Sequence, residues 1–551
     1  MKKPLRIRIL LIYAWLLPAC VTTTPADYEL NTDFEIVEGG HPWQWQYWYG
    51  DSNGYRFALD SDVKCQGQYA LRIEASQDSP RAWAGVAGSR LPIWFKMRHL
   101  RLRGYLKRDA VAEDALAGLW CRVQRRDGYP RHEEHSERAR TPSEDWTWYE
   151  LSMPLDENAT EMAFGGMLNG QGRLWLDSLS LDVDGIPYAQ AADRAATTVA
   201  SLWLPTLSAQ ARPLSPDQPW PALHARLASA PLTVLWLPDD GLQAPWQVAQ
   251  QLWQSGHYRW LALPSSWGLL RLPPPPPEQV ATATPNLLPD WQPSAELTHL
   301  LQTAAGRDAL TGIDLGLPDP VLLRLRPVYG HHRAWRAFDS LHRHLMHQIG
   351  RSLVSRSSVQ LLRRYQAQLG TWPRPDSLAA DWQWLDQLPG FYARQGASAY
   401  RDSCRLATLE RLLAQGPTLL LMRGSPQVHQ RTSFLRRLRA HFGAHACVVG
   451  LTVGQGQALR PAGAVAPLHA LGPHCYEAYL DQLGYRACWL DLAPWQRPSS
   501  TPWQPRQMFW RNQEATQTGQ PFTTLRLSDA FDVVVYLADS GPAHPPMAQR
   551  R

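Results

Sequence analysis

Cys20 is the residue whose surroundings point most directly to a chemical reaction. It follows an apolar stretch over 9–17 and a basic start that contains Lys2, Lys3, Arg6 and Arg8. A positive end, a short apolar stretch and the small Ala19 before a cysteine are typical of a bacterial lipoprotein signal. We therefore expect residues 1–19 to be removed and the Cys20 thiol to be acylated. The alternatives are an ordinary signal peptide or a short membrane anchor, with Cys20 incidental.

Acyl chains on Cys20 would hold the protein to a membrane, with residues 20–27 as a lipidated tether. No other stretch is apolar over the roughly 18 residues that a spanning helix needs. Val21 follows the cysteine, where an aspartate would often mark retention in the inner membrane. The sequence thus favours the outer membrane, facing the periplasm or the cell surface.

The sequence lacks several other chemical signatures. It contains no G-x-S-x-G elbow, no H-E-x-x-H pair and no phosphate-binding loop. His342, His344 and His347 lie on an expected helix without a third ligand at helical spacing, so a solvated helix face is the better interpretation. The net charge of +6 is spread over 551 residues without basic runs. Nucleic acid is therefore excluded as a partner, and no cofactor is demanded.

A change of composition near residue 190 divides the chain into two kinds of structure. Residues 28–186 show short alternating strands separated by turns, over 69–74, 100–106, 119–124, 146–153 and 174–183. This pattern predicts an all-β jelly-roll sandwich.

The second half alternates apolar runs with helical patterns. Candidate strands lie at 234–237, 260–263, 418–422, 447–453, 487–492 and 533–537, with helices at 244–255, 334–348 and 402–414. We predict a multidomain protein in which the sandwich is followed by an α/β domain with a largely parallel sheet, over 220–543. Residues 187–219 form a linker or a first helix, and 544–551 a tail.

The first half resembles the carbohydrate-binding modules that precede many secreted bacterial enzymes. The resemblance rests on residues 31–35, 67–73, 146–151 and 170–181. In such jelly rolls the counterparts of Glu35 and Asp177 often lie near a structural calcium ion, because hard cations take carboxylate and carbonyl oxygens. The alternative for these two carboxylates is the capping of turns.

Tryptophan is unusually frequent, with 26 against 11 phenylalanines. Trp43, Trp45 and Trp48 form the densest group and could provide a platform on which sugars stack. Their spacing puts Trp43, Trp45 and Tyr47 on one face, a pattern that is more typical of a core.

The second half resembles the erythromycin esterase family along most of its length. The matching stretches are 291–297, 312–314, 401–402, 416–422, 434–443, 448–456, 487–492 and 529–537. The resemblance implies an α/β fold and ester hydrolysis, in which histidines and carboxylates activate a water molecule.

The expected catalytic residues are replaced in this chain. The G-E-x-T-H-G loop of active members corresponds to 236–241, so the histidine position holds Asp240. Pro264 stands where a glutamate ends the next strand, and Gly424 and Gln427 replace two later histidines. A shift of alignment would leave His429 as a base near Asp239 or Asp240.

Three functions remain open from the sequence. The preferred one is a diverged, non-catalytic relative that binds a small molecule or a cell-envelope component. The second is an active ester or lactone hydrolase with a relocated site made of Asp239, Asp240 and His429. The third is a glycan-binding envelope scaffold, which exposed tryptophans in a row on one face of the sandwich would favour.

Overall fold

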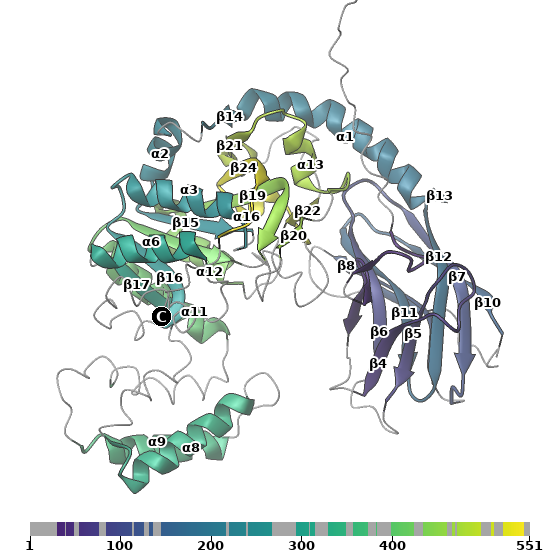
Figure 1. Ribbon diagram of the computed structural model, residues 1–551, viewed down its shortest axis with the longest axis horizontal. Coiled ribbons are helices and arrows are strands. Elements are labelled where there is room, and N and C mark those ends of the chain that lie inside the picture. Colours follow the sequence, from purple (N-terminus) through teal and green to yellow (C-terminus); the bar gives the residue numbers. More distant parts are fainter. Residues whose placement is uncertain are drawn as a thin grey trace, which may run out of the picture.

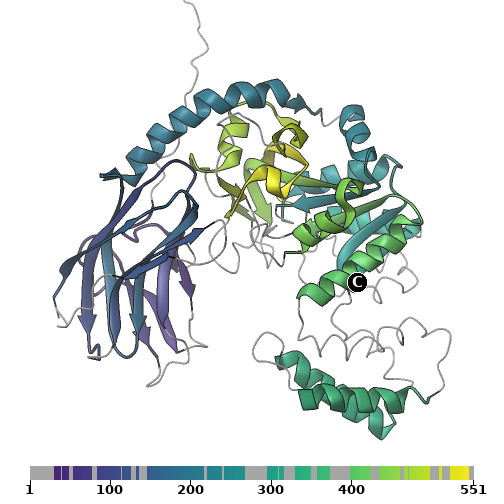
Figure 2. The ribbon, with the colours of Figure 1, turned by 180° about the vertical axis from the view of Figure 1, so that it is seen from behind.

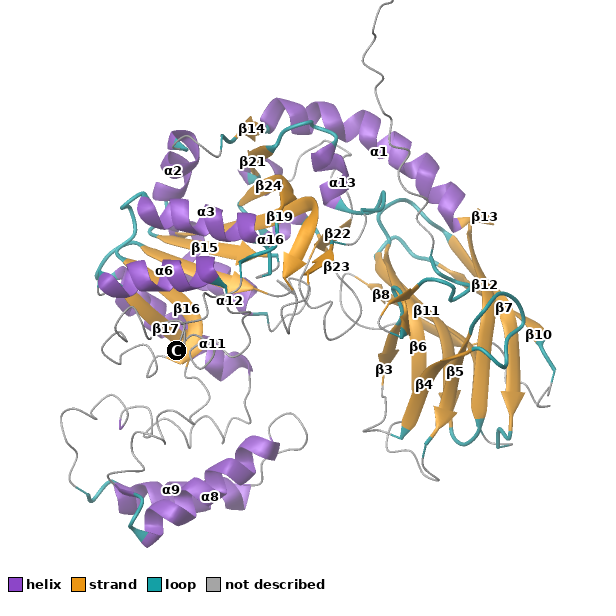
Figure 3. Cartoon of the chain, viewed as in Figure 1, coloured by secondary structure: helices purple, strands orange, loops and turns teal. Residues whose placement is uncertain are grey.

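The structure is a computed structural model that shows two large bodies of secondary structure joined by a long helix, with the helices α8 (Arg333–Gln348) and α9 (Arg356–Leu369) paired with each other and set apart from both bodies (Figure 1, Figure 3). The described residues are 30–38, 40–48, 54–76, 84–112, 115–125, 132–135, 145–215, 220–238, 241–266, 294–307, 309–314, 329–348, 356–372, 382, 398–423, 433–459, 465–468, 471–496, 508–511 and 522–544.

The first body is a sandwich of two antiparallel sheets. The six-stranded sheet has the order β10 (Thr147–Pro154), β7 (His99–Asp109), β12 (Arg173–Val183), β5 (Ala70–Ala75), β4 (Tyr55–Asp60), with β13 (Ile186–Pro187) beside β12. The five-stranded sheet has the order β3 (Gln46–Trp48), β6 (Gly85–Pro92), β11 (Ala159–Asn169), β8 (Leu116–Arg125), β9 (His132–His135). A small hairpin of β1 (Val37–Glu38) and β2 (His41–Pro42) precedes them.

Alternation of side chains places the core between the two sheets. In β7, Leu100, Leu102 and Leu106 face inward and are buried, whereas Arg101 and Arg103 face outward. Since successive side chains of a strand point to opposite faces, this one strand supplies both a core surface and a polar surface.

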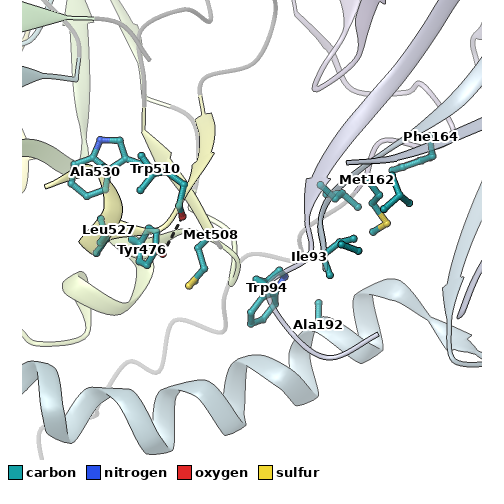
Figure 4. Close-up of a cluster of buried hydrophobic side chains, with 14 of the residues drawn as sticks. Ile93, Trp94, Met162, Phe164, Ala192, Tyr476, Met508, Trp510, Leu527 and Ala530 are labelled. Atoms are coloured by element: carbon teal, nitrogen blue, oxygen red, sulfur yellow. Dashed lines mark hydrogen bonds between the residues drawn. The ribbon is translucent and has the colours of Figure 1, made fainter. Parts of the chain in front are cut away.

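Helix α1 (Tyr188–Gln210) connects the two bodies and packs against both, as the front and back views show (Figure 1, Figure 2). At its start Tyr188 is fully buried and accepts a hydrogen bond from Trp94 Nε1 at 3.4 Å. Farther along, Trp203 packs on aromatic rings of the α/β domain, with centroids 5.6 Å from Tyr476 and 5.4 Å from Tyr479. The buried cluster around Trp94, Ala192 and Tyr476 is therefore continuous across α1 (Figure 4).

The second body contains a sheet of nine strands. Its order is β14 (Arg212–Pro213), β21 (Ala487–Asp491), β24 (Val533–Ser540), β19 (Ala446–Leu459), β15 (Leu232–Leu237), β18 (Thr418–Arg423), β16 (Trp260–Ser266), β17 (Leu310–Asp314), with β20 (Val465–Pro467) beside β19. The central pairings are parallel, whereas β21 pairs antiparallel with both of its neighbours, β24 and β14. All six residues of β15 are buried, as expected of a parallel strand covered on both faces.

Helices cover both faces of this sheet. One face holds α2 (Pro221–Ala228), α3 (Gln243–Gln254) and α6 (Ala295–Gly306). The other holds α11 (Ser398–Leu413), α12 (Phe434–Phe442) and α13 (Tyr476–Asp481). The remaining elements are α8 (Arg333–Gln348), α9 (Arg356–Leu369), η3 (Gly443–His445), α14 (Ala493–Gln496), α16 (Leu527–Ala530) and the hairpin β22 (Met508–Arg511) with β23 (Phe522–Leu525).

The predicted fold class is confirmed: an antiparallel sandwich precedes an α/β domain with a mixed, mostly parallel sheet. The segment 187–219, left open between linker and helix, contains α1. Cys475 and Cys488 are free thiols. Among the described helices, none has the length and apolar character needed to cross a bilayer.

Candidate functional site

The outer face of the five-stranded sheet carries apolar side chains where an antiparallel sandwich usually shows polar ones. This second, smaller cluster is separate from the central core. It consists of Ala84, Val86, Trp120, Ala163 and Met167, with Trp48 and Leu116 packed against it. The five central members are themselves only 0–4% exposed, so the half-buried Trp48 is the part of this cluster that a ligand can reach.

Two indole rings meet above this sheet although their strands are not neighbours. Trp48 is on β3 and Trp120 on β8, which are three strand spacings apart, or about 14 Å. Their ring centroids nevertheless lie 5.7 Å apart. The two strands between them, β6 and β11, pair Gly88 with Gly165, so the sheet has no side chains at this point beneath the rings. A Cβ on Gly88 would lie 2.6 Å from the backbone carbonyl oxygen of Phe164 and 3.2 Å from the Trp48 ring. A Cβ on Gly165 would clash with the backbone of β6, so the two glycines mainly allow β6 and β11 to approach closely, and Gly88 also leaves room for Trp48.

An arginine lies over each ring, and one of the two, Arg90, also pairs with Glu161 at 3.9 Å. The Arg90 guanidinium carbon lies 5.1 Å from the centroid of Trp48, and that of Arg122 lies 5.4 Å from Trp120. Arg90 and Arg122 belong to one row across the sheet, since both are registered with Ala163. We call Trp48, Trp120, Arg90 and Arg122 the aromatic surface. It combines ring faces with guanidinium donors, the chemistry that holds the apolar face and the hydroxyl groups of a saccharide.

The two indoles contribute differently. Trp48 is half-buried and is the ring that a ligand can reach, whereas Trp120 is only 2% exposed and supports it. Sequence reasoning selected Trp48 but missed Trp120 and both arginines. The available signal was the outward position of Trp120 in the alternation of its strand, opposite Gly165.

Trp43 and Trp45 do not join this surface. Trp45 is 3% exposed, donates from Nε1 to the carbonyl of Asn31 at 2.9 Å, and packs edge-on against Phe34 and Phe164. No sugar can stack on a ring in that position, which corrects the expectation that Trp45 belongs to a platform. Trp43 is half-buried in the turn before β3, where its carbonyl accepts from the Asn31 amide.

Glu35 and Asp177 both hold the loop between β4 and β5. Asp177 Oδ2 accepts from the backbone of Cys65 at 2.7 Å and Gln66 at 2.9 Å. Glu35 Oε1 accepts from Gln68 and Tyr69, and Gly67 between them has a positive φ of 62°. Burial raises the pKa of Asp177.

These contacts show both carboxylates capping turns. Within the described part of the chain, no three His, Cys, Asp or Glu side chains form a group that could hold a metal. Backbone carbonyls are common calcium ligands, so the structural calcium ion at Glu35 and Asp177 stays a prediction.

The carboxyl ends of the parallel strands are where α/β proteins place their ligands. Asp239, Asp240, Gly424, Gln427 and His429 follow these strand ends, but they lie outside the described residues. The relocated catalytic set of Asp239, Asp240 and His429 therefore stays a prediction.

Two of the positions singled out by the resemblance to the esterases, Pro264 and Asp402, lie within the described residues. Pro264 lies inside β16, at the irregularity between Leu263 and Ser266. The Asp402 carboxylate is buried; it pairs with Arg405 of the same helix at 3.5 Å and joins α11 to α12 through Arg437 at 3.2 Å. These ion pairs explain Asp402 without a catalytic role.

A buried polar cluster lies just beyond the end of β15, around Glu477. Its Oε1 accepts from the Thr452 hydroxyl at 2.5 Å and from the backbone N–H of Arg511 at 2.9 Å. The Arg511 side chain donates to the carbonyls of Val453 and Gly454. Burial raises the pKa of Glu477, and the Arg511 charge opposes that rise. Since Glu477 is 0% exposed, the cluster fastens β22 to β19 and offers no surface to a ligand.

Comparisons with known proteins give distant similarities. No model of a known protein family matches the chain. It is 31% identical over 151 residues to the uncharacterized HTH-type transcriptional regulator YbfP of Bacillus subtilis strain 168; the match covers 26% of this chain and 45% of the relative. The chain therefore spans less than half the length of this relative.

Two solved structures are also similar. A Bacillus cereus protein matches with a TM-score of 0.45 and 14% identity, covering 63% of this chain and 98% of its own. The C-terminal family 22 carbohydrate-binding module of Clostridium thermocellum Xyn10B matches with a TM-score of 0.23 and 14% identity, covering 28% of this chain and 96% of its own.

Proposed function

We propose that this protein is a glycan-binding lipoprotein of the bacterial cell envelope. The observation that carries the proposal is the aromatic surface, where Trp48 and Trp120 meet above the paired glycines with an arginine over each ring. Indole faces hold the C–H face of a pyranose ring, and arginine N–H groups donate to its hydroxyl oxygens. The resemblance of this half of the sequence to carbohydrate-binding modules supports the same function.

The α/β domain is proposed as a diverged relative of the erythromycin esterases that does not hydrolyse esters. The support is the replacement of the aligned residues, with Asp240 and Pro264 where active members have a histidine and a glutamate. Without a base held in reach of a bound ester, the water that must attack is not activated. The domain then serves as a support for the sandwich, or binds a small molecule or envelope component without turnover.

Substitution of Trp48 tests the glycan site. Trp48→Ala removes the accessible ring, so we expect the affinity for a bound polysaccharide to fall about tenfold, the loss of roughly 1.4 kcal/mol of stacking. Titration calorimetry of the purified protein against a panel of soluble plant and bacterial polysaccharides measures this.

The matched control is Trp148→Ala. Trp148 is 45% exposed on the outer face of the other sheet, next to Tyr105, and should leave the affinity unchanged. Equal losses in both variants, or full affinity in Trp48→Ala, would show that the glycan binds elsewhere or that the loss is non-specific.

Lipidation at Cys20 is tested by a change of that residue alone. In a Gram-negative host the protein should carry acyl chains and partition into a detergent phase, whereas Cys20→Ser should partition into the aqueous phase. Mass spectrometry of the N-terminal peptide measures the modification. An unmodified Cys20, or a Cys20→Ser variant that still enters the detergent phase, would contradict the anchor.

A further inference from the structure

Arg108 occupies a position in the sandwich where the pattern calls for an apolar residue. It follows Leu100, Leu102, Gly104 and Leu106 on the inner face of β7, and it is only 3% exposed. Its inward neighbour across the sheet is Leu174 of β12. A charge taken out of water is costly unless it is paired.

The described structure provides no anion for this charge. Arg108 stacks on the ring of Tyr149, with the guanidinium carbon 4.8 Å from the centroid. Its Nε and Nη2 are buried without a hydrogen-bond partner among the described residues. Burial lowers the pKa of Arg108, which agrees with an uncompensated charge.

The two unpartnered atoms lie on the same edge of the guanidinium. That edge presents two parallel N–H donors, which match the two oxygens of a carboxylate. The same strand supplies an internal comparison, because Arg101 turns its Nε and Nη2 to the Asp182 carboxylate at 3.3 and 2.8 Å. Arg101 is thus satisfied by the chain itself, and Arg108 is not.

The strand arrangement leaves one side of Arg108 without a neighbour in the sheet. β10 begins at Thr147, which pairs with Leu106, so the pairing of β10 with β7 ends before Arg108 is reached. Arg108 also lies near the end of the sandwich opposite α1, because β12 starts beside it at Arg173 and runs toward β13. Because Arg108 is only 3% exposed, a ligand would have to enter from this edge, where no strand is paired beside it.

We propose that Arg108 and Tyr149 form a binding site for the carboxylate group of a small organic acid or a sugar acid. The carboxylate would accept from Nε and Nη2 of Arg108, while the Tyr149 ring covers the guanidinium plane. This inference goes beyond the glycan site and does not depend on it, since Arg108 faces the interior and the aromatic surface faces outward.

Titration calorimetry of the purified protein with acetate and glucuronate tests the site. We expect one carboxylate per chain, abolished in Arg108→Met and weakened about tenfold in Arg108→Lys, because lysine keeps the charge but lacks the two parallel donors. Arg101→Met, on the outer face of the same strand, should bind as the original protein does. Trp48→Ala should also bind carboxylate fully, which separates this site from the glycan site.

The ligands themselves distinguish the sources of the carboxylate. Equal affinity for acetate and glucuronate supports a site for any small carboxylate, and tighter glucuronate binding supports a sugar acid. Sulfate binding as tight as either, or no carboxylate binding, would overturn the proposal, as would full binding by Arg108→Met or Arg108→Lys.

The melting temperature measured without ligand tests the proposal independently of binding. Removal of an unpaired buried charge should raise the melting temperature, so Arg108→Met should melt higher than the original protein in a buffer free of carboxylates. Added glucuronate should raise the melting temperature of the original protein and leave that of Arg108→Met unchanged. A lower melting temperature of Arg108→Met would overturn the proposal, since it would mean that the chain itself satisfies Arg108.

Discussion

Replacing Trp203 with alanine is expected to lower the free energy of unfolding by about 4 kcal/mol. Trp203 is 3% exposed in α1, and its ring centroid lies 5.4 to 6.0 Å from Tyr476, Tyr479 and Trp495. Truncation removes the buried apolar area of an indole and three aromatic contacts, and it leaves a cavity between α1 and α13. Urea denaturation followed by circular dichroism measures the loss.

The neighbouring Leu202 provides the matched control. It is 36% exposed on the same helix, so Leu202→Ala should cost less than about 1 kcal/mol. Because α1 joins the two bodies, we also expect Trp203→Ala to separate a single unfolding transition into two. A loss in Trp203→Ala no larger than that in Leu202→Ala would contradict the packing of α1 against the α/β domain.

Acidification is expected to destabilise the α/β domain through His474. This side chain is 1% exposed, and burial lowers its pKa to about 3. In the unfolded chain the pKa returns to about 6.5, so the unfolded state binds more protons between these values. Stability therefore falls as the pH drops below about 6.5, by roughly 3 kcal/mol at pH 4.

His474→Phe isolates this effect, since phenylalanine fills the site beside Phe509 and does not titrate. The difference in unfolding free energy between the two proteins should change by roughly 3 kcal/mol from pH 7 to pH 4. Glu477 acts in the opposite direction, because its raised pKa gives stability that is lost as the pH rises. It is common to both proteins and cancels in the difference.

A second variant controls for a general effect of losing a histidine. His445 is exposed, so the stability of His445→Gln should follow the pH profile of the original protein. A difference between His474→Phe and the original protein that stays constant from pH 7 to pH 4 would show that His474 is not a buried neutral group.

The alternation of apolar and polar residues predicted those strands of the sandwich whose sequences follow it. The predicted strands at 100–106 and 174–183 lie within β7 and β12, whose inward residues form the core. By contrast, β6 and β11 carry Gly85, Gly88, Gly165 and Gly166, and glycines in a sequence are read as turns. These strands escaped sequence reasoning because the glycines interrupt their apolar pattern. A Cβ at any of the four positions would clash with packed neighbours, and at Gly88 one of these neighbours is the Trp48 ring.

The candidate site was predictable only in part. Trp48 stood out by its type, but its contact with Trp120 depends on a register that no local pattern specifies. Trp43 and Trp45 are close to Trp48 in sequence, yet the turn before β3 directs Trp45 into the core. In the α/β domain the strands were recognisable as buried apolar runs, whereas antiparallel pairing of β21 depends on partners distant in sequence.

The most direct test of the glycan site observes the indole N–H groups during binding. In NMR spectra of protein labelled with ¹⁵N-tryptophan, the Trp48→Phe variant assigns the Trp48 signal, and Trp148→Phe assigns that of Trp148. On titration with a polysaccharide fragment that binds, we predict a shift of the Trp48 signal and none of the Trp148 signal. A Trp48 signal that stays in place at saturation, while other indole signals move, would contradict it.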